Sequence, residues 1–303
     1  MNSVPTYRHR FEALGLRALL RLVRLFPVQA CSNFGGFLGR SIGPSLGITR
    51  KADLNLKLAL PELSATERKQ IIRDMWDNLG RVIFEYPHLR EIVQKHDQYI
   101  TVSGLEKFQQ PRKEGKALLF IGAHIGNWEI LPMTAALLGY PQTILVRQPN
   151  NPLVAKIIDD IRTSTGNHSA SKGVDGARAS LKALRNKEAV GLLADQKMND
   201  GVEVPFFGIP AMSPAAPAIL GAKTDVAVFP IQCKRTGPAS FHLICHDALE
   251  FPNSGKRDQD CLEGMTELNR IFEGWIRETP GQWLWLHRRW PKAAYKKLKE
   301  KSE

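Results

Sequence analysis

The segment ALLFIGAHIGNWEI, residues 117–130, decides the fold because it contains a buried strand and the turn that follows it. Residues 117–121 are apolar and uncharged and follow a polar turn, a pattern typical of a strand buried on both faces of a parallel sheet. Asn127 is a residue type that caps helices, and residues 128–138 favour a helix. His124 is therefore expected in a strand-to-helix turn.

This turn determines which side chains approach His124. On a continuous helix, residues five apart point about 140° away from each other, so His124 and Glu129 meet only if His124 lies outside the helix. We predict that His124 accepts a hydroxyl proton as a general base while Glu129 binds its other ring nitrogen and fixes the tautomer. The alternative is a histidine satisfied by backbone groups at a buried turn, and the H-x4-E spacing alone favours that alternative.

The rest of the chain alternates strand-like and helix-like segments from about residue 98. Strands are expected at residues 98–103, 117–123, 142–147, 189–195, 225–233 and 240–246. Helices are expected at residues 128–139, 152–165, 174–187, 214–222 and 258–278. This alternation predicts an α/β fold with a mostly parallel central sheet flanked by helices.

The first 95 residues are expected to be mostly helical. A helix is expected near residues 51–60, and Ser64 with Glu67 forms a capping box before another. A Gly/Pro-rich break is expected over residues 27–47. We therefore divide the chain into an N-terminal helical, membrane-associating region (1–95) and an α/β core with a basic aromatic C-terminal tail (96–303).

Polar side chains follow several of the expected strands. Sites in parallel sheets collect at the carboxyl ends of the strands, where His124 also lies. We predict substrate contacts from Arg147, Arg162, Asp195, Gln196 and Asn127.

Composition limits the functional classes. The 303 residues carry a formal charge of +12, with 43% hydrophobic residues, which supports a folded core and an acidic partner such as nucleic acid, an anionic membrane, or an acidic protein or substrate. The four cysteines are widely spaced and show no zinc-ligand spacing, so we predict a reduced chain without metal or cofactor. GPSLG at residues 43–47 matches G-x-S-x-G but lacks the preceding strand, so Ser45 is set aside as a nucleophile.

The N-terminal segment shows an arginine stripe. At about 100° per residue, Arg10, Arg17, Arg21 and Arg24 fall within an arc of about 60° on an otherwise apolar helix. This pattern suits a helix lying in a membrane interface. The alternative is a helix packed on the core with a solvated basic edge. No uninterrupted apolar run is long enough to span a membrane.

The C-terminal segment QWLWLHRRWPKAAYKKLKEK, residues 282–301, interleaves aromatic and basic residues. Such a pattern fits nucleic-acid binding, the rival hypothesis from another functional class. It also fits anchoring at a membrane surface. A third interpretation is an edge strand followed by a solvated tail.

The chain resembles the late acyltransferases of lipid A biosynthesis, the lauroyl/myristoyl type within the lysophospholipid acyltransferase superfamily. The resemblance rests on five segments: NLGRVIFEY (78–86), GAHIGNWE (122–129), NNPLVAKIIDDIR (150–162), LLADQKMNDGVEVPFFGIPAMSPAAPAIL (192–220) and PGQWLWLHRRW (280–290).

The resemblance implies a glycerolipid-acyltransferase-like fold and transfer of a fatty acyl chain from acyl carrier protein to a hydroxyl or hydroxyacyl group of a lipid A precursor. It places the reaction on the cytoplasmic face of the bacterial inner membrane. It makes His124 and Glu129 the catalytic pair and Arg162 and Asp195 further active-site residues. Alternative acceptors are another glycolipid or a lysophospholipid. The apolar loop VPFFGIPAM, residues 204–212, either lines an acyl-chain groove or packs at the surface. The expected partners are acyl carrier protein, a lipid A precursor and an anionic membrane surface, not nucleic acid.

Overall fold

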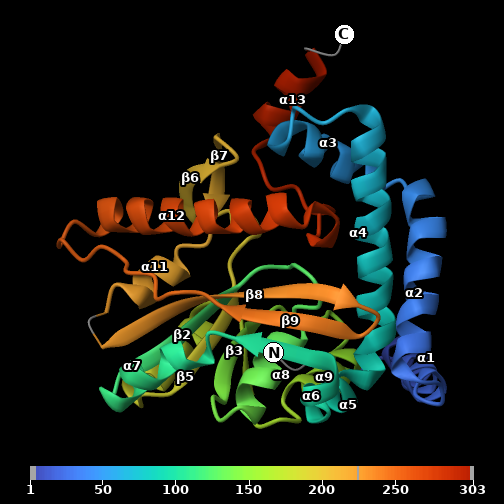
Figure 1. The fold of residues 1–303 in the computed structure, drawn as a ribbon, viewed down its shortest axis with the longest axis horizontal. Coiled ribbons are helices and arrows are strands. Elements are labelled where there is room, and N and C mark those ends of the chain that lie inside the picture. Colours follow the sequence, from blue (N-terminus) through green and yellow to red (C-terminus); the bar gives the residue numbers. More distant parts are fainter. Residues whose placement is uncertain (1–4, 224, 301–303) are drawn as a thin grey trace.

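The computed structural model describes residues 5–223 and 225–300. The N-terminal region is helical, as expected (Figure 1). Its elements are α1 (Tyr7–Val23), α2 (Val28–Ile42), η1 (Gly43–Ser45), α3 (Thr49–Ala59), α4 (Ala65–Glu85), η2 (Tyr86–His88), α5 (Leu89–Gln94) and α6 (His96–Tyr99). The Ser64 capping box at the start of α4 is confirmed, since Ser64 Oγ accepts from Glu67 N at 3.2 Å and Glu67 Oε2 accepts from Ser64 N at 2.7 Å.

The expected break over residues 27–47 is wrong, because most of it forms α2. Its glycines do not interrupt the helix but allow it to lie against α4. A Cβ atom at Gly39 would overlap the carbonyl oxygen of Trp76, and one at Gly35 would overlap that of Gly80. Close helix packing therefore outweighs the low helix propensity of glycine.

The central sheet has seven strands in the order β1-β9-β8-β2-β5-β3-β4. The strands are β1 (Ile100–Ser103), β2 (Ala117–Gly122), β3 (Gln142–Val146), β4 (His168–Ser171), β5 (Ala189–Leu193), β8 (Val226–Gly237) and β9 (Ser240–Cys245). All neighbouring pairs are parallel except β8 with β9. The predicted mostly parallel α/β sheet is confirmed. The edge strand β4 was not predicted.

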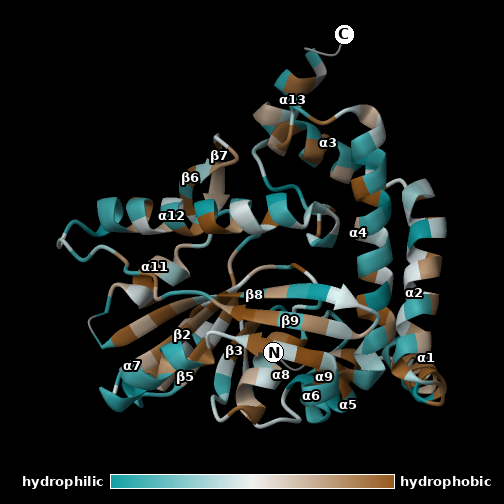
Figure 2. Cartoon of the chain, in the orientation of Figure 1, coloured by the Kyte–Doolittle hydropathy of each residue, from teal (hydrophilic) through white to brown (hydrophobic). Residues whose placement is uncertain are grey.

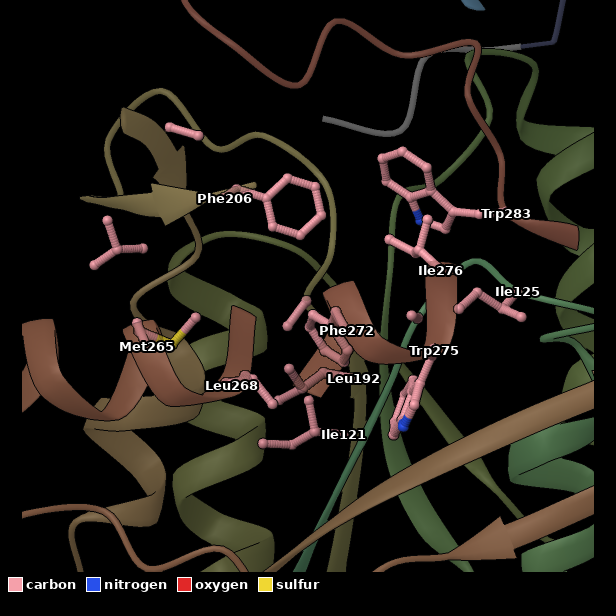
Figure 3. Close-up of a cluster of buried hydrophobic side chains, with 14 of the residues drawn as sticks. Ile121, Ile125, Leu192, Phe206, Met265, Leu268, Phe272, Trp275, Ile276 and Trp283 are labelled. Atoms are coloured by element: carbon pink, nitrogen blue, oxygen red, sulfur yellow. The ribbon is translucent and has the colours of Figure 1, made fainter. Parts of the chain in front are cut away.

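Helices cover both faces of the sheet. The remaining elements are η3 (Leu105–Phe108), α7 (Gln109–Lys113), α8 (Ile130–Leu137), α9 (Pro152–Arg162), α10 (Val174–Arg185), α11 (Ala216–Gly221), α12 (Arg257–Glu278), η4 (Pro280–Gln282) and α13 (Lys292–Glu300). Ile121 and Leu192 pack with α12 side chains such as Phe272 on one face (Figure 3). On the other face, Phe120 packs with Phe108 of η3.

The loop that was considered for the acyl-chain groove is instead a hairpin of β6 (Val202–Phe206) and β7 (Ile209–Ser213). Val204, Phe206 and Ala211 are buried in the same core cluster as α12. The groove alternative for residues 204–212 is therefore not supported, because Val204, Phe206 and Ala211 face the protein core and no residue of this segment lines the cavity described below.

The C-terminal aromatic residues are also buried. Trp283, Trp285 and Trp290 are at most 2% exposed. The expected edge strand is absent from the described residues there, and a single bridge joins Trp283 to Ile125. The three indoles are thus unable to stack on bases or sit among lipid headgroups. The basic tail follows as α13, in which Lys296 and Lys297 are exposed; residue 301 lies outside the described residues.

Candidate active site

His124 lies two residues beyond the end of β2, at the carboxyl edge of the sheet. A sharp turn follows it, in which Gly126 has a φ of +61° and approaches Cys233 so closely that a Cβ atom would lie 2.5 Å from the Cys233 oxygen. Only glycine adopts this conformation without strain in so little space. The strand-to-helix turn predicted for His124 is therefore present.

His124 pairs with Asp195, which follows the neighbouring strand β5. The Nδ1 atom of His124 lies 2.7 Å from Asp195 Oδ1, and the backbone N–H of His124 donates to Asp195 Oδ2 at 3.0 Å. An anionic carboxylate at this position fixes the proton on Nδ1 and leaves Nε2 as the acceptor. This arrangement suits a general base.

Asp195 is completely buried yet ionised. Burial alone would raise the pKa of its carboxyl, but the charge of His124 and the hydrogen bonds from His124 and Trp283 together lower the pKa to about 2. Trp283 Nε1 donates to Asp195 Oδ2 at 2.7 Å. The carboxylate therefore remains charged at neutral pH and able to stabilise an imidazolium.

The prediction that Glu129 binds the ring of His124 is wrong. Both carboxylate oxygens of Glu129 instead bind Arg162, the last residue of α9, at 2.7 Å from Nε and 2.5 Å from Nη2. The forked guanidinium matches a carboxylate in this bidentate geometry. Burial would lower the pKa of Arg162, but the bonds and charge of Glu129 outweigh it and raise the pKa.

A cavity of about 430 Å³ opens beside this pair. Of the predicted site residues, the structure brings five to its wall: His124, Glu129, Arg147, Arg162 and Gln196.

Two predicted substrate contacts lie away from this wall. Asn127 is fully buried, and its amide donates to Glu85 Oε2 at 2.8 Å. It holds the turn and does not contact the cavity, contrary to the prediction. Asp195 lies behind His124 and acts on it and not directly on substrate.

Three cations stand at the mouth of the cavity. Arg147, Lys172 and Lys197 are exposed, and within residues 5–223 and 225–300 none of them forms an ion pair. They are therefore available to an anionic group of a substrate.

Sequence reasoning missed the part played by the C-terminal segment. Besides the bond from Trp283 to Asp195, Leu284 N donates to His124 O at 3.1 Å, and Gly126 N donates to Gln282 O at 3.2 Å. His287 also lies near the site, since burial and then the charge of His124 lower its pKa. The aromatic residues of this segment were interpreted as surface groups, which hid its contact with the His124 turn.

Comparison with known proteins identifies a family. The family described as bacterial lipid A biosynthesis acyltransferase matches residues 5–292. The chain is 26% identical to the lipid A biosynthesis palmitoleoyltransferase of Escherichia coli (strain K12) over 272 residues, covering 84% of this chain and 83% of that protein. It is 25% identical to a lipid A biosynthesis acyltransferase of Haemophilus influenzae over 287 residues, covering 90% and 85%.

A second group of relatives acts on another glycolipid. The phosphatidylinositol mannoside acyltransferase of Mycobacterium tuberculosis is 29% identical over 161 residues, half of each chain. The family match, in contrast, extends over nearly the whole length of this protein. The chain therefore belongs to the bacterial lipid A biosynthesis acyltransferase family.

Proposed function

We propose that this protein transfers a fatty acyl chain from acyl carrier protein to a hydroxyl or hydroxyacyl group of a lipid A precursor. The observation that carries the proposal is the His124–Asp195 pair at the mouth of a largely apolar cavity. The cavity would take the acyl chain, and the exposed cations at its mouth would bind phosphates of the acceptor. The acidic carrier protein suits the net charge of +12.

The reaction is a direct transfer. Nε2 of His124 takes the proton of the acceptor hydroxyl as its oxygen attacks the thioester carbonyl carbon. The tetrahedral intermediate collapses with cleavage of the C–S bond, and the imidazolium returns the proton to the leaving thiolate. Arg162, held by Glu129, supplies positive charge for the oxyanion.

An acyl-enzyme step is not part of this proposal. Cys245 lies on the cavity wall, but burial raises the pKa of its thiol to about 12, so it is not a thiolate at neutral pH. Ser45, set aside from its sequence context, lies in η1 and does not line the cavity.

The test is acyl transfer by the purified protein with acyl carrier protein thioesters and a lipid A precursor, followed by mass spectrometry of the product. Addition of one acyl chain to the precursor is the expected result. Acylation of a mannosylated phosphoinositide or a lysophospholipid instead would contradict the proposed acceptor. Acylation of the precursor from a coenzyme A thioester alone would contradict the proposed donor.

The Glu129–Arg162 pair gives a separate prediction. Glu129→Gln keeps the shape but removes the charge-assisted bonds that hold Arg162, so we expect kcat/KM to fall about tenfold to a hundredfold. A double-mutant cycle should show strong coupling between Glu129→Gln and Arg162→Lys. Additive losses in that cycle would mean that Glu129 acts independently of Arg162.

The N-terminal helices support attachment to a membrane surface, and we propose that this is the cytoplasmic face of the inner membrane. None of the helices in the described ranges combines the length and apolar character of a membrane span. However, α1 turns Ala13 and Val23 toward the protein and exposes its other side, including Tyr7 at 89% and Phe11 at 79%. Figure 2 shows further hydrophobic residues along the outer helix α2, where Phe34, Phe37 and Ile42 are more than half exposed.

This surface lies beside the arginine stripe. At about 100° per residue, Tyr7, Phe11, Leu14 and Leu22 fall within an arc of about 80°, and the arc of the four arginines adjoins it. A helix lying in the plane of the interface would place the apolar arc among the acyl chains and the arginines at anionic headgroups. The alternative in which the apolar face of α1 packs on the protein core does not fit these exposures.

We therefore predict that replacing Phe11, Leu14 and Leu22 by serine weakens binding to anionic vesicles by at least about a hundredfold, because each buried apolar side chain contributes about 1.5–3 kcal/mol. Vesicle cosedimentation measures this. Leu262→Ser is the matched control, since Leu262 is an exposed leucine on α12, 43% exposed. Equal binding by the triple variant and the control would exclude α1 as the membrane contact.

A further inference from the structure

The cavity runs from the His124 edge down one face of the sheet beneath α8. Strand register defines its levels: Gly122 lies beside Leu193, and one pleat lower Phe120 lies beside Gly191, which pairs with Ile144. One pleat lower again, Leu118 and Gln142 both pair with Ala189. All but Leu118 and Ala189 line the cavity. On these three strands, the Gln142 level is therefore the inner end of the cavity wall.

Two glycines on this wall leave room for the side chains that lie over them. Gly122 and Gly191 stand at successive levels on adjacent strands, on the face that carries the cavity. A Cβ atom at Gly191 would overlap Gln142 Oε1. Glycine within a strand marks a place where another group approaches the backbone closely. Here that group is the carboxamide of Gln142, which reaches up one level from the inner end.

This carboxamide faces the cavity without a protein partner. Gln142 is 4% exposed. Its backbone N–H donates to Asn167 at 3.1 Å, but its side-chain amide has no hydrogen-bond partner in the described part of the chain. Aromatic residues line the same cavity: Phe108 packs 5.0 Å from Phe120 and 5.5 Å from Tyr140, measured between ring centroids. An amide without a protein partner requires another polar partner, and in an open cavity that partner is water.

We propose that Gln142 is a specificity-determining residue that sets the longest acyl chain the cavity accepts. The proposal rests on the proposed acyl transfer. An acyl chain that ends above the carboxamide leaves the water bound to the amide in place. A longer chain displaces this water, so the amide contacts methylene groups and has no hydrogen-bond partner. Loss of this hydrogen bond is expected to lower kcat/KM roughly tenfold to hundredfold for thioesters whose acyl chain exceeds the limit, relative to thioesters within it.

The limit follows from the strand geometry. The carboxamide stands at the Gly191 level, one pleat or about 7 Å below Gly122. With bond lengths near 1.5 Å and angles near 111°, an extended chain advances about 1.25 Å per carbon, so about five carbons fill this span. The carbons between Gly122 and the reacting carbonyl add to this number.

The test compares two near-isosteric variants on a series of acyl carrier protein thioesters that lengthens by two carbons at a time. Gln142→Met removes the amide and is expected to raise kcat/KM roughly tenfold or more for thioesters just beyond the wild-type limit, with little change for shorter ones. Gln142→Glu keeps a polar end and is expected to retain the limit. Thr143→Val is the control, because Thr143 is a buried polar residue of the same strand on the opposite face.

A binding experiment distinguishes a failure of this inference from a failure of the proposed function. The same series is bound to the His124→Ala chain, with and without Gln142→Met, so that no turnover is required. A wild-type enzyme that transfers no acyl chain would refute the proposed function. A binding limit that moves to longer chains in Gln142→Met would still support the role of Gln142 in setting the longest accepted chain. An unchanged limit in Gln142→Met, or a limit that moves only with Phe108→Leu, would overturn the inference.

Discussion

His124→Ala is expected to lower kcat for acyl transfer by about 10³, within the range of about 10² to 10⁴ that a general base supplies. Nδ1 of His124 is bonded to Asp195, so Nε2 is free to accept the proton of the acceptor hydroxyl. No other histidine among the described residues lines the cavity. Initial rates with saturating thioester and acceptor measure the loss.

The fold of this variant should persist, since the bonds that place the turn come from the backbone. His124 N donates to Asp195, and His124 O accepts from Leu284 N. The control is His168→Ala, an exposed histidine at the amino end of β4, which should retain full activity. Turnover of folded His124→Ala near the wild-type rate would contradict general-base catalysis by His124.

The sheet was predictable because its strands are apolar runs of the usual length. Residues 117–121 and 189–193 have few polar groups, and both form central strands. Strand β4 has the sequence His-Ser-Ala-Ser, with no apolar run, and was missed. The helix α2 was missed for a different reason: its glycines were interpreted locally, whereas their role is to contact α4.

Most members of the candidate site were predictable from the sequence, but their pairing was not. Spacing along the chain suggested Glu129 as the partner of His124, because five residues separate them. The structure pairs His124 with Asp195, 71 residues away, because β2 and β5 are neighbours in the sheet. Strand order is a tertiary property, and a single sequence of alternating elements does not reveal it. The bond from Trp283 was hidden for the same reason.

If Asp195 and not Glu129 orients His124, neutralising Asp195 should lower the activity more than neutralising Glu129. Asp195→Asn preserves size but puts a neutral amide opposite Nδ1, so the tautomer is no longer fixed and the imidazolium loses its counter-charge. We expect kcat to fall by up to about 10³, the loss expected for His124→Ala, because Asp195 acts through His124. This is a larger loss than that expected for Glu129→Gln. The reverse ranking would return the orienting role to Glu129.

Asp195→Asn should also change how stability depends on pH. The pKa of Asp195 is lowered from an ordinary value of 3.8 to about 2, so ionised Asp195 stabilises the fold above the unfolded-state pKa, and this contribution disappears as pH falls through the folded-state pKa. The shift corresponds to about 2 kcal/mol. Urea unfolding should therefore show wild type more stable than Asp195→Asn by about 2 kcal/mol at pH 7, with the difference shrinking from about pH 4 to about pH 2. A difference that stayed constant across this window would show that the charge of Asp195 contributes nothing to the fold. The position would then matter only for its shape and hydrogen bonds, and the catalytic loss would have to be explained by tautomer choice alone.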